Sequence, residues 1–106
     1  MKNMSNILFI CSRNQWRSPT AERIFRQKGY SVRSAGTSPN AKRSVSVADI
    51  KWANEIFVME KKHKNRIVAK FTRLVEHKPI HILNIADEYR FMDPNLVSHL
   101  EDSMIP

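Results

Sequence analysis

The sequence predicts an α/β fold: one three-layer domain, residues 1–106, in which a four-stranded parallel sheet carries helices on both faces. Two observations lead to this prediction. Short apolar runs alternate along the chain with longer stretches whose apolar residues recur at helical spacing. Residues 7–10, Ile-Leu-Phe-Ile, are apolar without alternation, which is typical of a strand that is buried on both faces in a parallel sheet.

Three further segments are expected to form strands. Residues 56–59 are continuously apolar, residues 30–35 lie between two glycines, and residues 80–85 follow a proline. Each strand is followed by a helical pattern, so the order is strand–helix four times over. Parallel strands joined in this way are expected to have right-handed crossovers.

Serine–proline and aspartate–proline pairs mark two helix starts. Ser18 and Asp93 are each expected to be an N-cap, with the following proline at the first helical position. The first helix is expected to end near Gly29, and Pro79 closes a third helix that has a strongly basic outer face. The helices are therefore predicted from residue 18 to near 29, at 46–53, at 60–78 and from 93 to about 100.

The formal net charge is +8, and it is unevenly distributed. Acidic residues are concentrated in residues 87–106, so the rest of the chain is strongly basic. A basic body suits nucleic acid, an anionic substrate or solubility alone. No apolar run approaches 18 residues, so no membrane span is expected. The apolar run near the N-terminus is too short for a secretory signal, and a cytoplasmic location is therefore expected.

The single cysteine, Cys11, directly follows the first predicted strand and precedes a predicted helix. Ligands of open parallel sheets bind beyond the carboxyl ends of the strands. Backbone N–H groups and the helix dipole at this place favour an anion, so the loop from Cys11 to Ser18 is predicted to surround a phosphate. The same field favours the reactive thiolate.

The other loop residues fit this interpretation. Arg17 lies six residues after Cys11, a spacing that can bring its planar guanidinium back across the phosphate. Ser18 can donate to the thiolate or cap the helix, and Asn14 suits a left-handed backbone conformation. The alternative is that Cys11 is a buried small hydrophobe and the arginines are surface charges. The strand-to-helix context favours the phosphate loop, whose remaining members are Ser12, Arg13, Gln15 and Trp16.

These motifs resemble the low-molecular-weight protein tyrosine phosphatase family, as a short member. The resemblance lies in residues 7–11 with Asn14, Arg17-Ser18-Pro19 and Ala21-Glu22, and continues in residues 34–37 and in 52–53 with 56–59. It implies a phosphate monoester hydrolase that needs no metal or cofactor and acts on a phosphorylated protein or a small phosphate ester. The Cys11 thiolate would attack phosphorus, Arg17 and the loop amides would hold the oxygens, and water would hydrolyse a cysteinyl-phosphate.

The resemblance also implies an aspartic acid that protonates the leaving oxygen. Asp93 has the proline that follows the acid in the family, but Asp87 has its position directly after the fourth predicted strand. Asp87 is therefore predicted as the acid, with Glu88 in place of the proline, and Asp93 is kept as the alternative. Tyr89 is expected to line the entrance of the site, or else to pack as an ordinary aromatic residue.

Two loop residues differ from the family pattern. Arg13 replaces a glycine, which adds charge and bulk to the loop, and Trp16 replaces a second cysteine. Cys11 would then have no neighbour for a protective disulfide.

Two other functions remain open from the sequence. An arsenate reductase would need an external thiol, because the chain has no further cysteine. A non-catalytic phosphate-binding module could use the basic face of residues 60–78, and charge alone leaves nucleic acid open as a partner, although no nucleic-acid-binding signature is present. No metal site is expected, because the four histidines are scattered and Pro79 separates His77 from His81.

Overall fold

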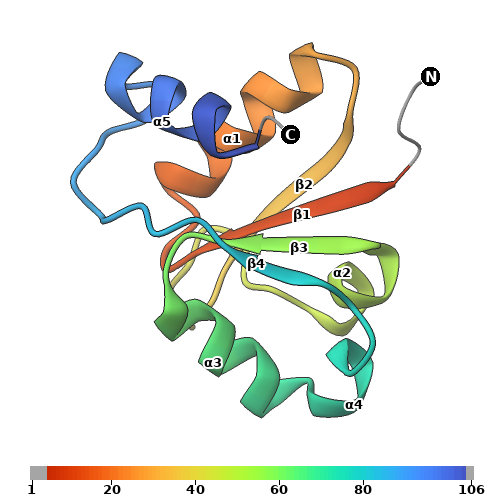
Figure 1. Ribbon diagram of the computed structural model, residues 1–106. Helices are drawn as coiled ribbons and strands as arrows, with labels where there is room; N and C mark the ends of the chain where they lie inside the picture. The colour runs from red at the N-terminus through yellow and green to blue at the C-terminus, as the bar shows by residue number, and fades with distance from the viewer. Residues whose placement is uncertain (1–4, 105–106) are drawn as a thin grey trace.

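The four predicted strands form one sheet. The computed structural model describes residues 5–104, and its strands are β1 (Asn6–Cys11), β2 (Ser31–Gly36), β3 (Glu55–Val58) and β4 (Ile80–Ile82). Their order in the sheet is β2-β1-β3-β4, and all three pairings are parallel (Figure 1). The predicted four-stranded parallel sheet is therefore confirmed.

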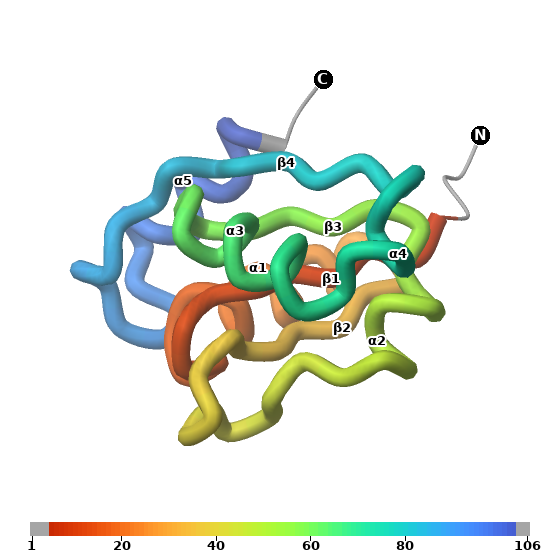
Figure 2. The backbone as a smooth tube through the Cα atoms, turned by 90° about the horizontal axis from the view of Figure 1, so that it is seen from below, coloured from red at the N-terminus to blue at the C-terminus, as the bar shows by residue number. Residues whose placement is uncertain are grey.

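Helices cover both faces of this sheet, as predicted. One face carries α1 (Arg17–Gln27) and α5 (Pro94–Met104), and the other carries α2 (Val47–Trp52), α3 (Lys61–Lys70) and α4 (Thr72–Val75). Figure 2 looks onto the second face, with α2, α3 and α4 turned toward the viewer. The fold thus has three layers: two helices, the sheet, and three further helices.

The apolar run in β1 is explained by its two buried faces. Phe9 and Cys11 belong to the core cluster beneath α1 and α5, whereas Leu8 and Ile10 belong to the cluster beneath α2, α3 and α4. Alternate residues of a strand point to opposite faces, so a central strand needs apolar side chains at every position. Leu8 has no exposed surface, and its truncation to alanine would cost about 2–5 kcal/mol of stability.

Two helix predictions need correction. Helix α1 begins at Arg17, with Trp16 as its N-cap residue, so Ser18 lies inside the first turn and is not the N-cap. The helix predicted at residues 60–78 is two helices, because the backbone leaves helical geometry at Phe71 (φ −121°, ψ 37°). Ile67, Phe71 and Val75 still share one core, which is why their spacing resembled that of one helix.

The fourth strand is shorter than predicted but its partner contacts continue. After Ile82, the N–H groups of Leu83 and Ile85 donate to the carbonyls of Val58 and Met59 at 2.9 and 2.8 Å. The chain therefore runs beside the end of β3 as far as Ile85. Helix α2 confirms its prediction, since Ser46 is its N-cap with a reciprocal capping box to Asp49.

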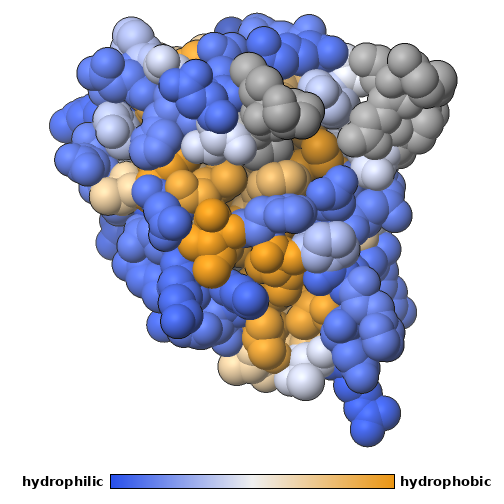
Figure 3. All heavy atoms as spheres, in the orientation of Figure 1, coloured by the Kyte–Doolittle hydropathy of each residue, from blue (hydrophilic) through white to orange (hydrophobic). Residues whose placement is uncertain are grey.

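Some apolar surface is exposed beside the edge strand. In Figure 3, apolar atoms ringed by hydrophilic ones lie in the region of β4 and of the space between it and α3 and α4. Val68, Val75 and Ile80 are among the residues that line a shallow cleft of about 350 Å³ on this side. None of the helices formed within residues 5–104 has the length and apolar character needed to cross a membrane.

Candidate active site

A small pocket lies at the carboxyl end of β1. Strand β1 has β2 on one side and β3 on the other, so the crossovers leave it in opposite directions, and such a point in a parallel sheet is where ligands bind. The loop that follows β1 leads directly into α1. The pocket has a volume of about 110 Å³ and is lined by Cys11, Arg13, Gln15, Trp16, Arg17 and Asp87.

The sulfur of Cys11 is surrounded by hydrogen-bond donors. The Asn14 N–H donates to Sγ at 3.2 Å, and Ser18 Oγ lies 3.0 Å from the same sulfur. Ser18 Oγ also accepts a hydrogen bond from Asn14 Nδ2 at 3.0 Å, and its own proton can go to the Ala35 carbonyl, 3.4 Å away, or to the closer sulfur. Both groups lie where they can donate to a negative charge that develops on sulfur. Ser18 therefore does not cap the helix; its hydroxyl lies beside the sulfur of Cys11 instead.

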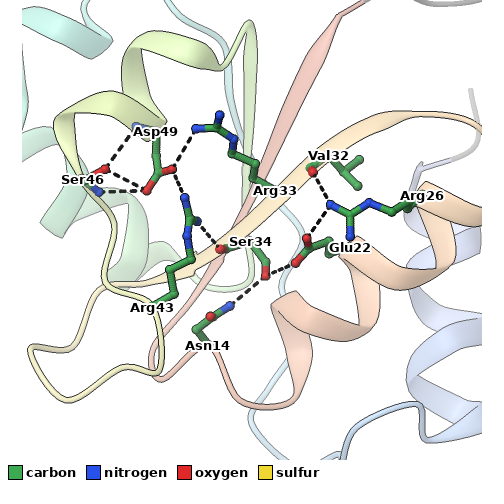
Figure 4. Close-up of polar contacts among 9 residues, drawn as sticks. All are labelled: Asn14, Glu22, Arg26, Val32, Arg33, Ser34, Arg43, Ser46 and Asp49. Carbon is green, nitrogen blue, oxygen red and sulfur yellow. Dashed lines mark hydrogen bonds and ion pairs between the residues drawn. The ribbon is translucent and has the colours of Figure 1, made fainter.

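Asn14 holds the turn of the loop in place. It has a left-handed backbone conformation (φ 54°), as the sequence suggested, and asparagine tolerates this conformation better than most residues. Its side chain also donates to Ser34 Oγ at 2.9 Å, and Ser34 in turn donates to Glu22 (Figure 4). The loop is therefore tied to β2 and to α1 by buried side chains.

The segment after β2 supports the loop from the other side. The N–H groups of Thr37, Ser38 and Lys42 donate to the carbonyls of Cys11, Ser12 and Arg13 at 2.9, 2.9 and 3.0 Å. This close approach depends on Gly36, because a Cβ atom there would lie 2.5 Å from the Ser12 carbonyl oxygen. The backbone of the loop after β1 is thus fixed by a neighbouring backbone.

A buried carboxylate anchors the same segment. Arg43 donates to the Ser34 carbonyl at 2.7 Å and pairs with Asp49 on α2, and Arg33 also reaches Asp49 at 3.2 Å (Figure 4). Burial alone would raise the pKa of Asp49, but the hydrogen bonds and charge of Arg43, with help from Ser46, outweigh it and lower that pKa. Asp49 therefore stays ionised and holds the segment against the sheet.

Arg17 is buried across the pocket from the cysteine. Its side chain is 1% exposed, and Nη1 donates to Glu60 Oε2 and to the Ile85 carbonyl, the latter at 2.7 Å. Nε is buried without a hydrogen-bond partner within residues 5–104, and Asp87 Oδ1 lies 3.7 Å from it. A buried guanidinium with an unsatisfied N–H beside a thiol is suited to an anion that occupies the pocket.

Glu60 was not predicted as a site residue. It follows β3, and its carboxylate pairs with the Arg17 guanidinium without lining the pocket itself. Burial would raise the pKa of Glu60, but the hydrogen bond and charge of Arg17 outweigh it and leave that pKa below its ordinary value. Glu60 belonged to a charge-rich stretch that resembled a solvated helix face. Its position directly after a buried strand, like that of Cys11, was the signal that could have identified it.

His63 is a second residue that the sequence did not single out. It is buried, and burial, assisted by the charge of Arg17, lowers its pKa to about 4. The ring is therefore neutral at pH 7. Its Nδ1 accepts from the Glu60 N–H at 3.0 Å, so Nε2 carries the proton and donates to Ser12 Oγ, 2.8 Å away. Ser12 Oγ therefore accepts from His63, and the Ser12 hydroxyl can donate its own proton to another acceptor.

The structure distinguishes the two candidate acids by their positions. Asp87 lines the pocket with Cys11, and its side chain is half exposed. Asp93 precedes α5, where its Oδ1 accepts from the Asn95 N–H at 2.8 Å and its carbonyl accepts from the Val97 N–H. Tyr89 is not among the residues that line the pocket; it packs against the core cluster beneath α1 and α5. This contact fits the packing alternative, and a place for Tyr89 at the entrance of the site stays a prediction.

The mouth of the pocket is aromatic and cationic. Trp16 lines it, and the Arg90 guanidinium lies 5.6 Å from the centre of the indole ring. Arg13 is exposed at the same mouth. Within residues 5–104, no group of three or more His, Cys, Asp or Glu side chains is arranged to hold a metal ion.

Comparison with known proteins shows a similarity to one family. The sequence profile described as low molecular weight phosphotyrosine protein phosphatase matches residues 6–55, and no curated protein matches significantly. The tyrosine phosphatase Wzb from Escherichia coli K30, in complex with phosphate, is similar in structure with a TM-score of 0.77, 21% identity, and coverage of 95% of this chain and 94% of that chain. The YwlE arginine phosphatase from Geobacillus stearothermophilus gives a TM-score of 0.72 and 23% identity, over 93% and 85% of the two chains.

A low molecular weight protein tyrosine phosphatase from T. tengcongensis gives similar values, with a TM-score of 0.73, 21% identity, and coverage of 95% and 92%. At these identities the structural likeness shows a shared fold. The matched sequence profile contains the loop from Cys11 to Ser18, which the structure places at the carboxyl end of β1. The chain therefore resembles the low-molecular-weight phosphotyrosine protein phosphatases in the sequence of residues 6–55 and in its fold, and members of that family are cysteine-dependent phosphatases.

Proposed function

We propose that the protein hydrolyses phosphate monoesters, with phosphotyrosine in proteins as its substrate, through a cysteinyl-phosphate intermediate. The observation that supports this most is the buried Arg17 Nε, which has no hydrogen-bond partner within residues 5–104 and belongs to a side chain that lines the pocket with Cys11. A phosphate oxygen would satisfy this donor. The pocket of about 110 Å³ has room for one phosphoryl group.

In the first step, the Cys11 thiolate attacks phosphorus in line with the leaving oxygen. The S–P bond forms as the P–O bond to the substrate breaks, and Asp87 gives its proton to the leaving oxygen. Arg17 and the loop amides hold the equatorial oxygens, where charge lies in the transition state. Asp87 is half exposed and lines the pocket, so it can reach a leaving group that arrives from solvent.

In the second step, water attacks phosphorus of the cysteinyl-phosphate. Asp87, now a carboxylate, takes the proton from this water, and the S–P bond breaks to release inorganic phosphate. The thiolate that leaves is stabilised by the Asn14 N–H and by the Ser18 hydroxyl, which are 3.2 and 3.0 Å from sulfur. Residue 16 is tryptophan and not a second cysteine, so no second thiol takes part in this cycle.

The mouth of the pocket favours an aryl phosphate. Trp16 offers an aromatic wall on which a phenol ring can pack. The similarity to the YwlE arginine phosphatase suggests phosphoarginine as an alternative substrate. The guanidinium group of that substrate would have to pass Arg13 and Arg90. Two arginines at the mouth disfavour a cationic group and favour a neutral ring.

The test is hydrolysis of p-nitrophenyl phosphate, a phosphotyrosine peptide and the matching phosphoarginine peptide by the wild type and by Cys11→Ser. We expect turnover of the two aryl phosphates, loss of that turnover in Cys11→Ser, and phosphoarginine hydrolysis at least tenfold slower. Wild-type protein that binds vanadate but hydrolyses none of the three would be a phosphate-binding module without catalysis. Faster hydrolysis of phosphoarginine would overturn the substrate assignment but leave the mechanism.

A further inference from the structure

A groove runs along α3 beside the proposed active site. Its larger part has a volume of about 380 Å³ and lies between α3 and the segment that follows β2. A smaller part of about 180 Å³ includes Ser12 and His63 and shares Thr37, Ser38, Pro39 and Arg66 with the larger one. In Figure 2, α3 and the segment after β2 lie on the same face of the sheet.

The groove has an apolar floor and a cationic rim. Val45, Ile67 and Phe71 are buried beneath it. Arg66 and Lys70 are exposed and line it, and neither forms an ion pair with any carboxylate of residues 5–104. Lys62 adds a third cation at the smaller part of the groove. Positions 62, 66 and 70 are four apart, so these three charges lie on one face of the helix.

The groove begins at the phosphate loop itself. His63 donates to Ser12, the residue after the nucleophile, at 2.8 Å. Ile67 and Phe71 are four and eight residues further along, which places the apolar floor about 6–12 Å from His63 along the chain at 1.5 Å per residue. An extended peptide covers this length with about two to four residues.

We propose that this groove binds the segment of a phosphoprotein substrate that flanks the phosphorylated residue, and that it selects an apolar side chain together with carboxylates about two to four residues away. The apolar side chain packs on Ile67 and Phe71, and the carboxylates face Arg66 and Lys70. This inference rests on the proposed function, because it assigns the substrate class of the same site.

A peptide fits the groove better than nucleic acid. The cations alone would suit either partner, since both are anionic. The apolar floor formed by Val45, Ile67 and Phe71 gives a phosphate backbone nothing to contact, whereas it suits a leucine or phenylalanine side chain. Phe71 also lies deep enough to be 6% exposed, so it offers no flat surface for base stacking.

The test measures binding of fluorescein-labelled phosphotyrosine peptides to the Cys11→Ser protein by anisotropy. One pair of peptides carries two glutamates and a leucine at positions two to four, before or after the phosphotyrosine. In the second, neutral pair, glutamine replaces glutamate and serine replaces leucine.

The protein variant that removes charge from the groove is Arg66→Ala/Lys70→Ala. Its matched control, Lys64→Ala/Arg73→Ala, removes the same charge from α3 and α4 outside the groove. Ala69→Glu adds a carboxylate at an exposed position that lines the groove.

We expect one of the two acidic–apolar peptides, with its motif either before or after the phosphotyrosine, to bind about tenfold more tightly than its neutral counterpart. Arg66→Ala/Lys70→Ala and Ala69→Glu should each remove most of this difference, and the control should keep it. Equal affinities for the two kinds of peptide in the wild-type groove would overturn the proposal. So would a single-stranded oligonucleotide that competes with the peptide and loses affinity in the same variants.

Failure of the proposed function gives a different result. It appears as absent hydrolysis of p-nitrophenyl phosphate, which is too small to reach the groove. The anisotropy measurement needs no turnover, so peptide selectivity is accepted or rejected on its own. With active wild-type protein, the same preference should appear as a higher ratio of peptide to p-nitrophenyl phosphate kcat/KM, and that ratio should fall in Arg66→Ala/Lys70→Ala.

Discussion

Glu60 and Arg17 are joined by a hydrogen bond from Arg17 Nη1 to Glu60 Oε2, and this contact connects two loops at the carboxyl edge of the sheet. Arg17 comes from the loop after β1 and Glu60 from the connection between β3 and α3. The carboxylate occupies one side of the guanidinium, so the unsatisfied Nε remains for the pocket. The buried cation is thereby both neutralised and oriented.

Removal of this carboxylate should slow the chemistry. In Glu60→Gln, Arg17 keeps the Ile85 carbonyl but loses its charged partner, so its orientation toward the transition state is less well fixed. We expect kcat with p-nitrophenyl phosphate to fall about tenfold, with KM changed less than threefold, and stability to fall by about 1–3 kcal/mol. Steady-state kinetics and urea unfolding measure the two effects.

Two variants make this experiment specific. Glu55→Gln, which removes a carboxylate on β3 that pairs with His81 on β4, should leave kcat unchanged. Glu60→Asp keeps the charge and should recover part of kcat. Wild-type kcat in Glu60→Gln would contradict a positioning role.

The two aspartates should differ in their dependence on the leaving group. Asp87→Asn should lower kcat by about 10²–10⁴ for phenyl phosphate, whose leaving oxygen needs a proton, and by less for p-nitrophenyl phosphate. Asp93→Asn should keep kcat, since Asp93 caps the start of α5. A set of aryl phosphates with graded leaving groups measures this. A larger and leaving-group-dependent loss in Asp93→Asn would transfer the role to that residue.

How much of the site the sequence predicts depends on the kind of signal that each residue carries. Cys11 and Asp87 follow apolar runs directly, and parallel strands bring such positions to one edge, so both could be placed in advance. Glu60 occupies the equivalent position after β3 but begins a run of charged residues, which masked it. His63 is defined by burial and by its contact with Ser12, and neither is visible in the sequence.

The helix starts illustrate the same limit for the fold. The aspartate–proline pair before α5 behaves as its pattern predicts, because the Asp93 carboxylate accepts from the Asn95 N–H in the first turn. At Ser18 the identical reasoning failed. The thiol of Cys11 lies 3.0 Å from its hydroxyl, and the helix begins one residue earlier. Tertiary contact decides between two uses of one side chain, and spacing alone does not reveal it.

The two glycines should respond differently to alanine. At Gly36 an added Cβ would lie 2.5 Å from the Ser12 carbonyl oxygen, so Gly36→Ala must displace the phosphate loop. At Gly29 the space is open but φ is +95°, so Gly29→Ala should cost about 1 kcal/mol of stability and leave activity intact. We expect vanadate affinity to fall at least tenfold in Gly36→Ala only. Equal vanadate affinities would show that the loop tolerates the displacement.

His63 should make stability depend on pH between 5 and 7. Burial lowers its pKa from 6.5 to about 4, so in this range the unfolded chain binds a proton that the folded chain does not. Stability must therefore rise with pH through this window, by about 2 kcal/mol between pH 5 and pH 7 from this residue. The lowered pKa values of Asp49 and Glu60 also make stability rise with pH, but their contribution is lost only at lower pH.

Urea unfolding of the wild type at pH 5 and pH 7 should show this rise in stability, and His63→Gln should remove most of it. His77→Gln, at an exposed position, should retain it. An equal rise in His63→Gln would mean that another group carries the pH dependence.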